Sequence, residues 1–328
     1  MPCHAGNCIT ILRWRRTLTF KDFIEKLFGR KPPLEQQQTG ELVTAPLSPE
    51  QLTHPAFAGE AAALPLTPSL EPQQLLVGCG QSVGRQREQN QDSIFAFTSL
   101  LASNNAQIPI GVYIVADGMG GHEDGDIASE VACRVMGEYI IRHLYLPLLT
   151  PNPEPPEQSI QEILHTGVQE ANEAIHKEAP NGGTTLTVAV VMGRQLSIAH
   201  VGDSRAYLIT PENGLELITR DHSMVNRLVE MGQLTPAEAS EHPQRNVLYR
   251  ALGQGEPLEA EVATHKLPKS GYLMLCSDGL WGVINAETIQ NIISAGPTPA
   301  EICQNLVAAA NQAGGPDNIS VILIQLPC

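Results

Sequence analysis

The sequence has few aromatic side chains, 4% of its 328 residues, and it has no long apolar run. A transmembrane helix needs about 20 consecutive apolar residues, so we expect no integral membrane span. The start does not read as a secretory signal either, because Arg13, Arg15 and Arg16 interrupt its short apolar run. Leu, Ile, Val and Ala must therefore fill the core.

Basic charge is also scarce, with 20 Lys and Arg against 35 Asp and Glu and a net charge of −15. Non-specific nucleic-acid binding needs a basic surface, so we expect no nucleic-acid partner. The seven cysteines are odd in number and scattered through a chain too large to need disulfide staples. That usage favours a reducing compartment, and we expect a cytoplasmic protein.

The first part of the chain differs in composition from the rest. Residues 1–31 carry seven Lys and Arg, and their apolar residues allow either a short surface- or partner-binding helix or a loosely ordered tail. Residues 32–72 are rich in proline, a composition that buries too little apolar surface to offset its ordering entropy. We predict a largely disordered basic segment and linker over 1–73, followed by one catalytic domain over 74–328.

Hydrophobic periodicity in residues 74–328 changes between helical and strand spacing. It predicts long helices over 127–140 and 156–179 and further helices near 286–294 and 299–313. Period-two and continuous apolar runs predict strands at 74–78, 93–98, 110–116, 184–192, 195–201, 204–210, 215–219, 259–265, 272–277 and 319–325. The gaps between the four strands from 184 to 219 are very short, so we expect an antiparallel meander there.

This order of elements does not follow the strand–helix–strand pattern of a parallel sheet. We therefore expect an α+β fold with two antiparallel sheets packed face to face and helices on both outer faces, a four-layer α/β/β/α sandwich.

Four aspartates lie at the ends of apolar strands, each beside Gly, Ser or Asn: Asp117, Asp203, Asp278 and Asp317. A single Asp-Gly is more often a turn, but strand ends from distant segments can converge on one rim of a sheet core. Converging carboxylates repel, and burying them without partners is costly. A divalent cation would resolve that repulsion, and oxygen ligands without cysteine favour Mg²⁺ or Mn²⁺.

Six segments in sequence order now resemble the metal-dependent protein phosphatase family, type 2C, in its bacterial form. They are SVGRQREQNQDS (82–93), VADGMGGH (115–122), GGTTLTVAVV (182–191), AHVGDSRAYLI (199–209), LCSDGLWGVI (275–284) and GGPDNISVILI (314–324). The resemblance covers about residues 74–328. It implies a serine/threonine phosphatase that opposes Ser/Thr kinases, in which a metal-bridging hydroxide attacks the phosphorus directly.

The resemblance also implies roles for individual residues. Asp117 would bridge two Mn²⁺ or Mg²⁺ ions, the carbonyl of Gly118 would join one ion, and Asp278 and Asp317 would complete both sites. Asp203 and Asp278 would hold a third, weaker ion that some members bind. Arg87 would bind the phosphate, since its planar guanidinium matches two phosphate oxygens; without the resemblance, a surface arginine is the plainer interpretation.

Three further residues receive supporting or alternative interpretations. His122 is a candidate proton donor to the leaving oxygen, or a solvent-facing histidine with no such role. Asn318 would support Asp317. Gln91, followed by Asp92, stands where the family usually has Glu, so it keeps an oxygen but loses a charge that helps to hold metal.

The irregular stretch 221–255 occupies the position of the family's flap, a plausible substrate-selecting insert. Two rival functions stay open. One is a regulatory phosphatase dedicated to a single partner, although 1–72 looks too short for a folded sensor. The other is a non-catalytic binding module, although no metal aspartate is lost. We expect a monomer that acts on phosphorylated proteins.

Overall fold

The computed structural model describes residues 73–103, 106–120, 124–150, 158–254 and 258–327. Residues 1–72 lie outside these ranges, so the expected disorder of the N-terminal segment stays a prediction. None of the described helices combines the length and the apolar character that crossing a bilayer requires.

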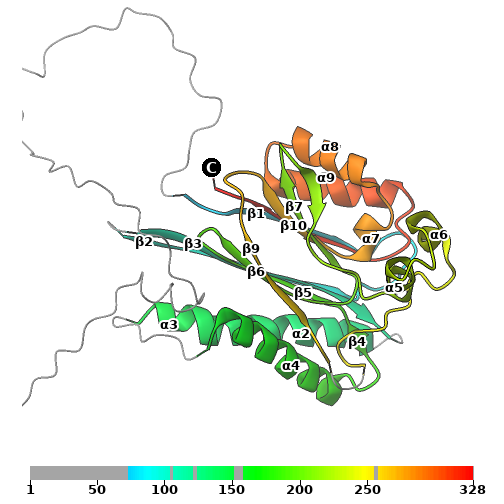
Figure 1. The fold of residues 1–328 in the computed structure, drawn as a ribbon, viewed down its shortest axis with the longest axis horizontal. Coiled ribbons are helices and arrows are strands. Elements are labelled where there is room, and N and C mark those ends of the chain that lie inside the picture. The colour runs from blue at the N-terminus through cyan, green and yellow to red at the C-terminus, as the bar shows by residue number, and fades with distance from the viewer. Residues whose placement is uncertain (1–72, 104–105, 121–123, 151–157, 255–257, 328) are drawn as a thin grey trace, which may run out of the picture.

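Two antiparallel sheets form the centre of the molecule (Figure 1). The first has the strand order β1-β11-β10-β7-β8, and the second has β2-β3-β5-β6-β9 with β4 paired to β3. The strands are β1 Leu76–Ser82, β2 Asp92–Ser103, β3 Ala106–Met119, β4 Gly183–Thr184, β5 Leu186–Met192, β6 Gln195–Val201, β7 Arg205–Thr210, β8 Gly214–Leu217, β9 Glu261–Lys266, β10 Tyr272–Cys276 and β11 Ile319–Gln325.

Helices cover the outer faces of both sheets (Figure 1). The helices of the described residues are α2 Asp124–Ile140, its continuation η2 Ile141–Tyr145 and α3 Leu146–Leu148, α4 Ile160–Glu178, α5 Met224–Glu230, α6 Pro236–Glu241, α7 Asp278–Trp281, α8 Ala286–Ala295 and α9 Pro299–Gln312. Helices α2 and α4 pack on the β2–β9 sheet, while α8 and α9 lie over the other.

Strand β3 shows how the sequence builds these layers. Successive side chains of a strand point to opposite faces. Val112, Ile114 and Ala116 join the apolar layer between the sheet and helices α2 and α4. Tyr113 and Val115 join the layer between the two sheets. A third apolar layer lies under α8 and α9, so the predicted four-layer α/β/β/α sandwich is confirmed.

The meander predicted over 184–219 is wrong at its centre. Strand β6 pairs with β5 and β9, whereas β7 pairs with β10 and β8 in the other sheet. The chain crosses between sheets at residues 202–204, where Gly202 adopts a φ of 105°, a conformation that glycine takes at little cost. Alternation of apolar residues reports which faces are buried, but it does not report which sheet a strand joins.

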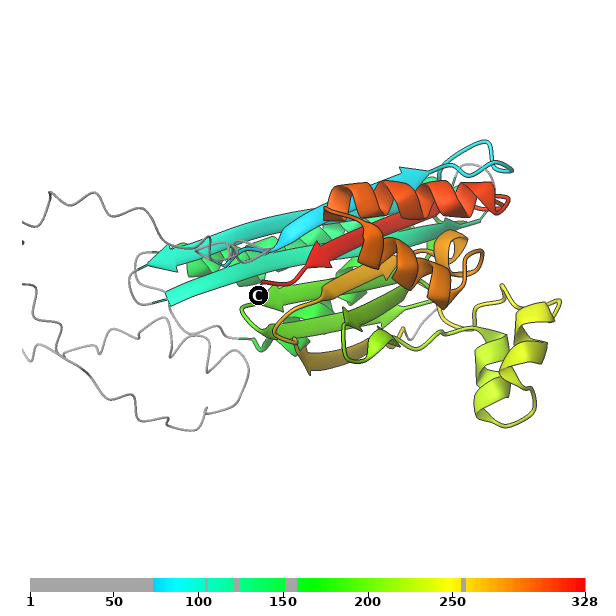
Figure 2. The same ribbon diagram turned by 90° about the horizontal axis from the view of Figure 1, so that it is seen from above.

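Several strand ends and residues 221–254 gather at one end of the sandwich (Figure 1). Helices α5 and α6 project there beyond the sheets (Figure 2). Helix α6 begins at Pro236, directly after the capping residue Thr235. An isolated bridge between Ser223 and Leu248 closes the base of the segment. We call residues 221–250 the flap; they are the greater part of the stretch 221–255 that the sequence predicts as the flap.

Candidate active site

Asp117 lies inside β3, directly opposite Asp92 on β2. Its backbone is held on both sides, because its N–H donates to Thr185 Oγ1 at 2.9 Å and its carbonyl accepts from Thr184 Oγ1 at 2.9 Å. Thr185 Oγ1 also contacts Ser204 Oγ at 2.7 Å. The two threonines therefore fix Asp117 and connect it to the residue after Asp203.

Asp278 and Asp203 lie where two other strands meet the same region. Asp278 opens α7 directly after β10 and Ser277. Asp203 is buried in the crossing between β6 and β7, and its carbonyl accepts a bond from Trp281 Nε1 at 3.1 Å. Ser277 Oγ donates to Asp92 Oδ2 at 2.7 Å. Short contacts thus join the segments that carry Asp92, Asp117, Asp203 and Asp278.

Asp317 precedes β11 and faces the loop that carries Arg87. Arg87 Nη2 donates to Asp317 Oδ2 at 2.7 Å. Asn318 holds this loop with its whole amide, since Nδ2 donates to the carbonyls of Val83 and Gln89 and Oδ1 accepts from the Gln91 N–H. Asn318 therefore supports the Arg87 loop as well as Asp317, whose Oδ1 accepts from the Asn318 N–H.

Burial raises the pKa values of four of these carboxyl groups. It raises the pKa of Asp92 to about 7, of Asp203 to about 8 and of Asp278 to about 6. The pKa of Asp117 is also raised well above its ordinary value, first by burial and then by the charges of Asp92 and Asp278. The aspartates thus share one poorly solvated region, and their mutual repulsion disfavours ionisation of all of them together.

Two observations test whether this region suits a cation. Asp92 Oδ1 and Asp278 Oδ1 are buried without a hydrogen-bond partner, and buried oxygens of this kind are rare unless something else binds them. In the parts of the chain that the structure describes, no three Asp, Glu, His or Cys side chains are gathered tightly enough to hold a metal ion alone. Mg²⁺ commonly binds through one or two carboxylates and keeps several waters, so the residues fit such an ion.

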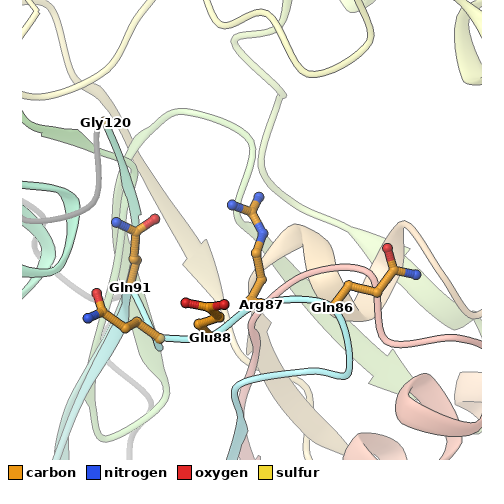
Figure 3. Close-up of a pocket in the computed structure, with 6 residues that line it drawn as sticks. Gln86, Arg87, Glu88, Gln91 and Gly120 are labelled. Atoms are coloured by element: carbon orange, nitrogen blue, oxygen red, sulfur yellow. The ribbon is translucent and has the colours of Figure 1, made fainter.

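A cavity of about 330 Å³ lies beside Arg87 (Figure 3). Its lining residues are Gln86, Arg87, Glu88, Gln89, Gln91 and Gly120. Figure 3 shows Arg87 and Gln91 extending in the same direction, with Glu88 between them and Gln86 turned away. The cavity wall therefore combines the guanidinium of Arg87, the carboxylate of Glu88 and several glutamine amides. Arg87 connects it to the aspartates through its bond to Asp317.

Of the other two residues singled out in the DGMGGH segment, the structure describes Gly118 but not His122. His122 lies outside the described residues, so its candidate role stays a prediction. Gly118 is buried, and a Cβ placed on it would lie 2.1 Å from the Gly125 carbonyl oxygen. Its N–H donates to the Gln91 carbonyl at 3.0 Å. Only glycine fits at this point between β3, the Arg87 loop and the start of α2.

Comparison with known proteins identifies this arrangement. The family model described as Protein phosphatase 2C matches residues 78–319. The chain belongs to the protein phosphatase 2C family. It is therefore an enzyme, a phosphoprotein phosphatase, and the resemblance of its six segments to this family is confirmed.

Individual relatives agree with this family assignment. Protein phosphatase PhpP of Streptococcus pneumoniae is 36% identical over 249 residues, which cover 74% of this chain and 94% of that protein. The crystal structure of the Mycobacterium tuberculosis serine/threonine phosphatase PstP/Ppp matches with a TM-score of 0.64 and 30% identity, over 77% of this chain and 99% of that one. A PstP catalytic domain in complex with two manganese ions matches with a TM-score of 0.62 and 28% identity, over 77% and 99% of the two chains.

Several residues that position the aspartates of the phosphatase carry no distinctive signal in the sequence. Thr184 and Thr185 belong to the GGTT segment, and Ser277 is the residue before Asp278. Their hydroxyls make the contacts described above. The available signal was the run of two hydroxyl residues at the start of a fully buried strand, where each hydroxyl needs a partner.

Proposed function

We propose that this phosphatase removes phosphate from phosphoserine and phosphothreonine in proteins with the help of Mn²⁺ or Mg²⁺, and that it opposes Ser/Thr kinases. The observation that carries the proposal is the set of five buried or half-buried aspartates, two of which keep a buried carboxylate oxygen without a partner. The similarity to a phosphatase solved with two manganese ions supports it.

The proposed ligands are the carboxylates of Asp117, Asp278 and Asp317 and the carbonyl of Gly118 for two ions. Asp203 would join Asp278 at a third, weaker position. Bound divalent ions would supply the acidification of water and the neutralisation of phosphate charge that this hydrolysis needs. Asp92 would hold Ser277, the residue before Asp278, in place through its 2.7 Å bond.

Arg87 is the proposed phosphate-binding residue. Only Nη2 of its guanidinium is engaged among the described residues, by Asp317, so its remaining donors can bind phosphate oxygens. The contact with Asp317 also fixes the direction of the side chain towards the aspartates. Gln91 would bind a metal ion more weakly than a glutamate at this position would, because its amide carries no charge. His122 remains the proposed proton donor to the leaving oxygen.

The test is hydrolysis of p-nitrophenyl phosphate and of a phosphothreonine peptide by the full chain. We expect no turnover after chelation and recovery on addition of Mn²⁺ or Mg²⁺. Release of phosphate without either ion, or full activity in Asp117→Ala, would contradict the proposal. We further propose that activity resides in residues 74–328 of a monomer, so removal of 1–72 should leave kcat/KM within about twofold.

A further inference from the structure

Arg205 is a half-buried arginine two residues after Asp203, and it makes contacts in three directions. Its Nε and Nη2 donate to both oxygens of Asp221, with Nη2 at 2.7 Å from Oδ2. Its Nη1 donates to the Tyr207 hydroxyl at 3.2 Å. Its guanidinium carbon lies 3.4 Å from the ring centre of Trp281. The guanidinium is thus held between two carboxylate oxygens and an aromatic face.

Two partners of Arg205, Trp281 and Asp221, belong to different functional segments, whereas Tyr207 lies on the same strand as Arg205. Trp281 is the last residue of α7, which Asp278 opens, and its indole N–H donates to the carbonyl of Asp203. Asp221 is the first residue of the flap, and its carbonyl accepts from Asn226 Nδ2 at 2.9 Å in α5. Figure 1 shows α7 and α5 on neighbouring sides of the strand ends.

The flap also holds the other side of the Asp203 turn. The His222 N–H donates to the Gly202 carbonyl at 2.8 Å, and the Gly202 N–H donates to His222 Nδ1 at 3.1 Å. Two supports therefore fix the turn that carries Asp203. Helix α7 binds the Asp203 carbonyl through Trp281, and the base of the flap binds the N–H and the carbonyl of Gly202 through His222. Arg205 connects these two supports to each other.

We propose that Arg205 is a positioning residue that acts through Trp281 and Asp221 to set the separation of the Asp203 and Asp278 carboxylates. The inference rests on the proposed function, because it treats these two aspartates as metal ligands. Arg205 touches neither the substrate nor the ions. It keeps the Asp203 turn, α7 and the base of the flap in one fixed arrangement, so an ion held between the two aspartates binds more tightly.

The geometry separates this role from that of an ordinary ion pair. An isolated half-buried ion pair adds little stability on its own, and lysine would serve nearly as well in one. The flat contact with Trp281 and the two-oxygen contact with Asp221 both need a planar guanidinium. Lysine keeps the charge but cannot make both contacts at once.

The experiment measures Mn²⁺ binding to the full chain by calorimetry and by electron paramagnetic resonance, with kcat and KM for p-nitrophenyl phosphate measured alongside. Trp281→Phe keeps an aromatic ring for Arg205 and removes the indole N–H that donates to Asp203, together with the five-membered ring. Arg205→Lys keeps the charge and removes the planar contacts. For both we expect the weakest Mn²⁺ site to lose affinity about tenfold, within the range for residues that orient metal ligands, while KM changes by less than about twofold and kcat falls.

Arg220→Lys is the matched control. Arg220 also pairs with a carboxylate of the flap, Glu230, but it makes no contact with α7 among the described residues. We expect its Mn²⁺ binding and kcat to match those of the unaltered chain. Unchanged Mn²⁺ affinity in both Trp281→Phe and Arg205→Lys, with only a lower melting temperature, would overturn the proposal.

Two further results of the experiment also bear on the proposal: a variant that does not fold, and a chain that binds Mn²⁺ without hydrolysing phosphate esters. If Arg205→Lys does not fold, Asp221→Asn takes its place, because it keeps Arg205 and Trp281 and weakens the two-oxygen contact with the guanidinium; unchanged Mn²⁺ affinity in that variant would overturn the proposal. If the unaltered chain binds Mn²⁺ but hydrolyses no phosphate ester, the proposed function fails, while the calorimetric comparison still tests the positioning role.

Discussion

The aspartate-bearing strand ends and the flap lie side by side but are built in opposite ways. Around the aspartates, strands from both sheets are buried on both faces, and hydroxyl and amide side chains fix the backbone. In the flap, α6 has no buried residue and α5 buries only Val225, while Met224, Met231 and Val247 stay exposed. A rigid region for chemistry thus adjoins a loosely packed one suited to varied protein surfaces.

The largest expected effect comes from removing a charge in the rigid region. Asp278→Asn keeps the shape of the side chain but loses the negative charge that would hold metal, so we expect kcat for p-nitrophenyl phosphate to fall about a thousandfold. The metal-free variant should melt no lower than the unaltered chain, because a buried carboxylate that other carboxylates repel has been neutralised.

Glu216→Gln is the control for this change, since Glu216 is exposed on β8. It should leave both kcat and the melting temperature unchanged. Substantial turnover in Asp278→Asn, measured under the same saturating Mn²⁺, would contradict the assignment of Asp278 as a ligand.

A smaller loss is expected where a side chain only positions an aspartate. Thr185→Val removes the hydroxyl that accepts from the Asp117 N–H and contacts Ser204. We expect kcat to fall about 10- to 100-fold, as for other residues that orient metal ligands. Thr185→Ser restores the hydroxyl and should recover most of the rate, so equal losses in the two variants would point to packing and not to the hydrogen bonds.

The contrast between Asp278 and Thr185 also shows what the sequence can reveal. Apolar runs beside Asp117, Asp203, Asp278 and Asp317 place each of them in or next to a strand, and four such residues in order predict a site. The hydroxyl of Thr185 carries no such mark, because its partners lie 68 and 19 residues away along the chain. The strand pattern from 184 to 219 likewise gave the strands but not the change of sheet at Gly202, because that choice depends on the distant strands β9 and β10.

The buried carboxyl groups also predict a pH effect on the stability of the metal-free protein. Burial raises the pKa of Asp92 to about 7 and of Asp203 to about 8, whereas an unfolded aspartate titrates near pH 4. The folded state therefore binds more protons than the unfolded state between about pH 4 and 8. The free energy of unfolding should fall as the pH rises through this range.

Histidines restrict where this effect is best measured. Burial lowers the pKa of His200 to about 4 and of His222 to about 3, so below about pH 6.5 they make stability rise with pH and oppose the aspartates. We therefore expect the melting temperature to fall by about 5 °C between pH 6.5 and 8.5. Asp203→Asn should flatten this slope, and saturating Mn²⁺ should abolish it; a melting temperature that rises over the same range would contradict the prediction.

The smallest effect is expected in the flap, and it should depend on the substrate. Met231 is 54% exposed at the end of α5, and Leu217, 43% exposed on β8 outside the flap, is the matched control. Replacing either with serine removes little packing, so the free energy of unfolding should change by less than about 0.5 kcal/mol. If the flap contacts protein substrates, Met231→Ser should raise KM for a phosphoprotein about two- to threefold and leave p-nitrophenyl phosphate unaffected, because that substrate is too small to reach α5. Leu217→Ser should change neither, and an equal rise of KM in both variants would show that the exposed apolar surface of the flap does not select substrates.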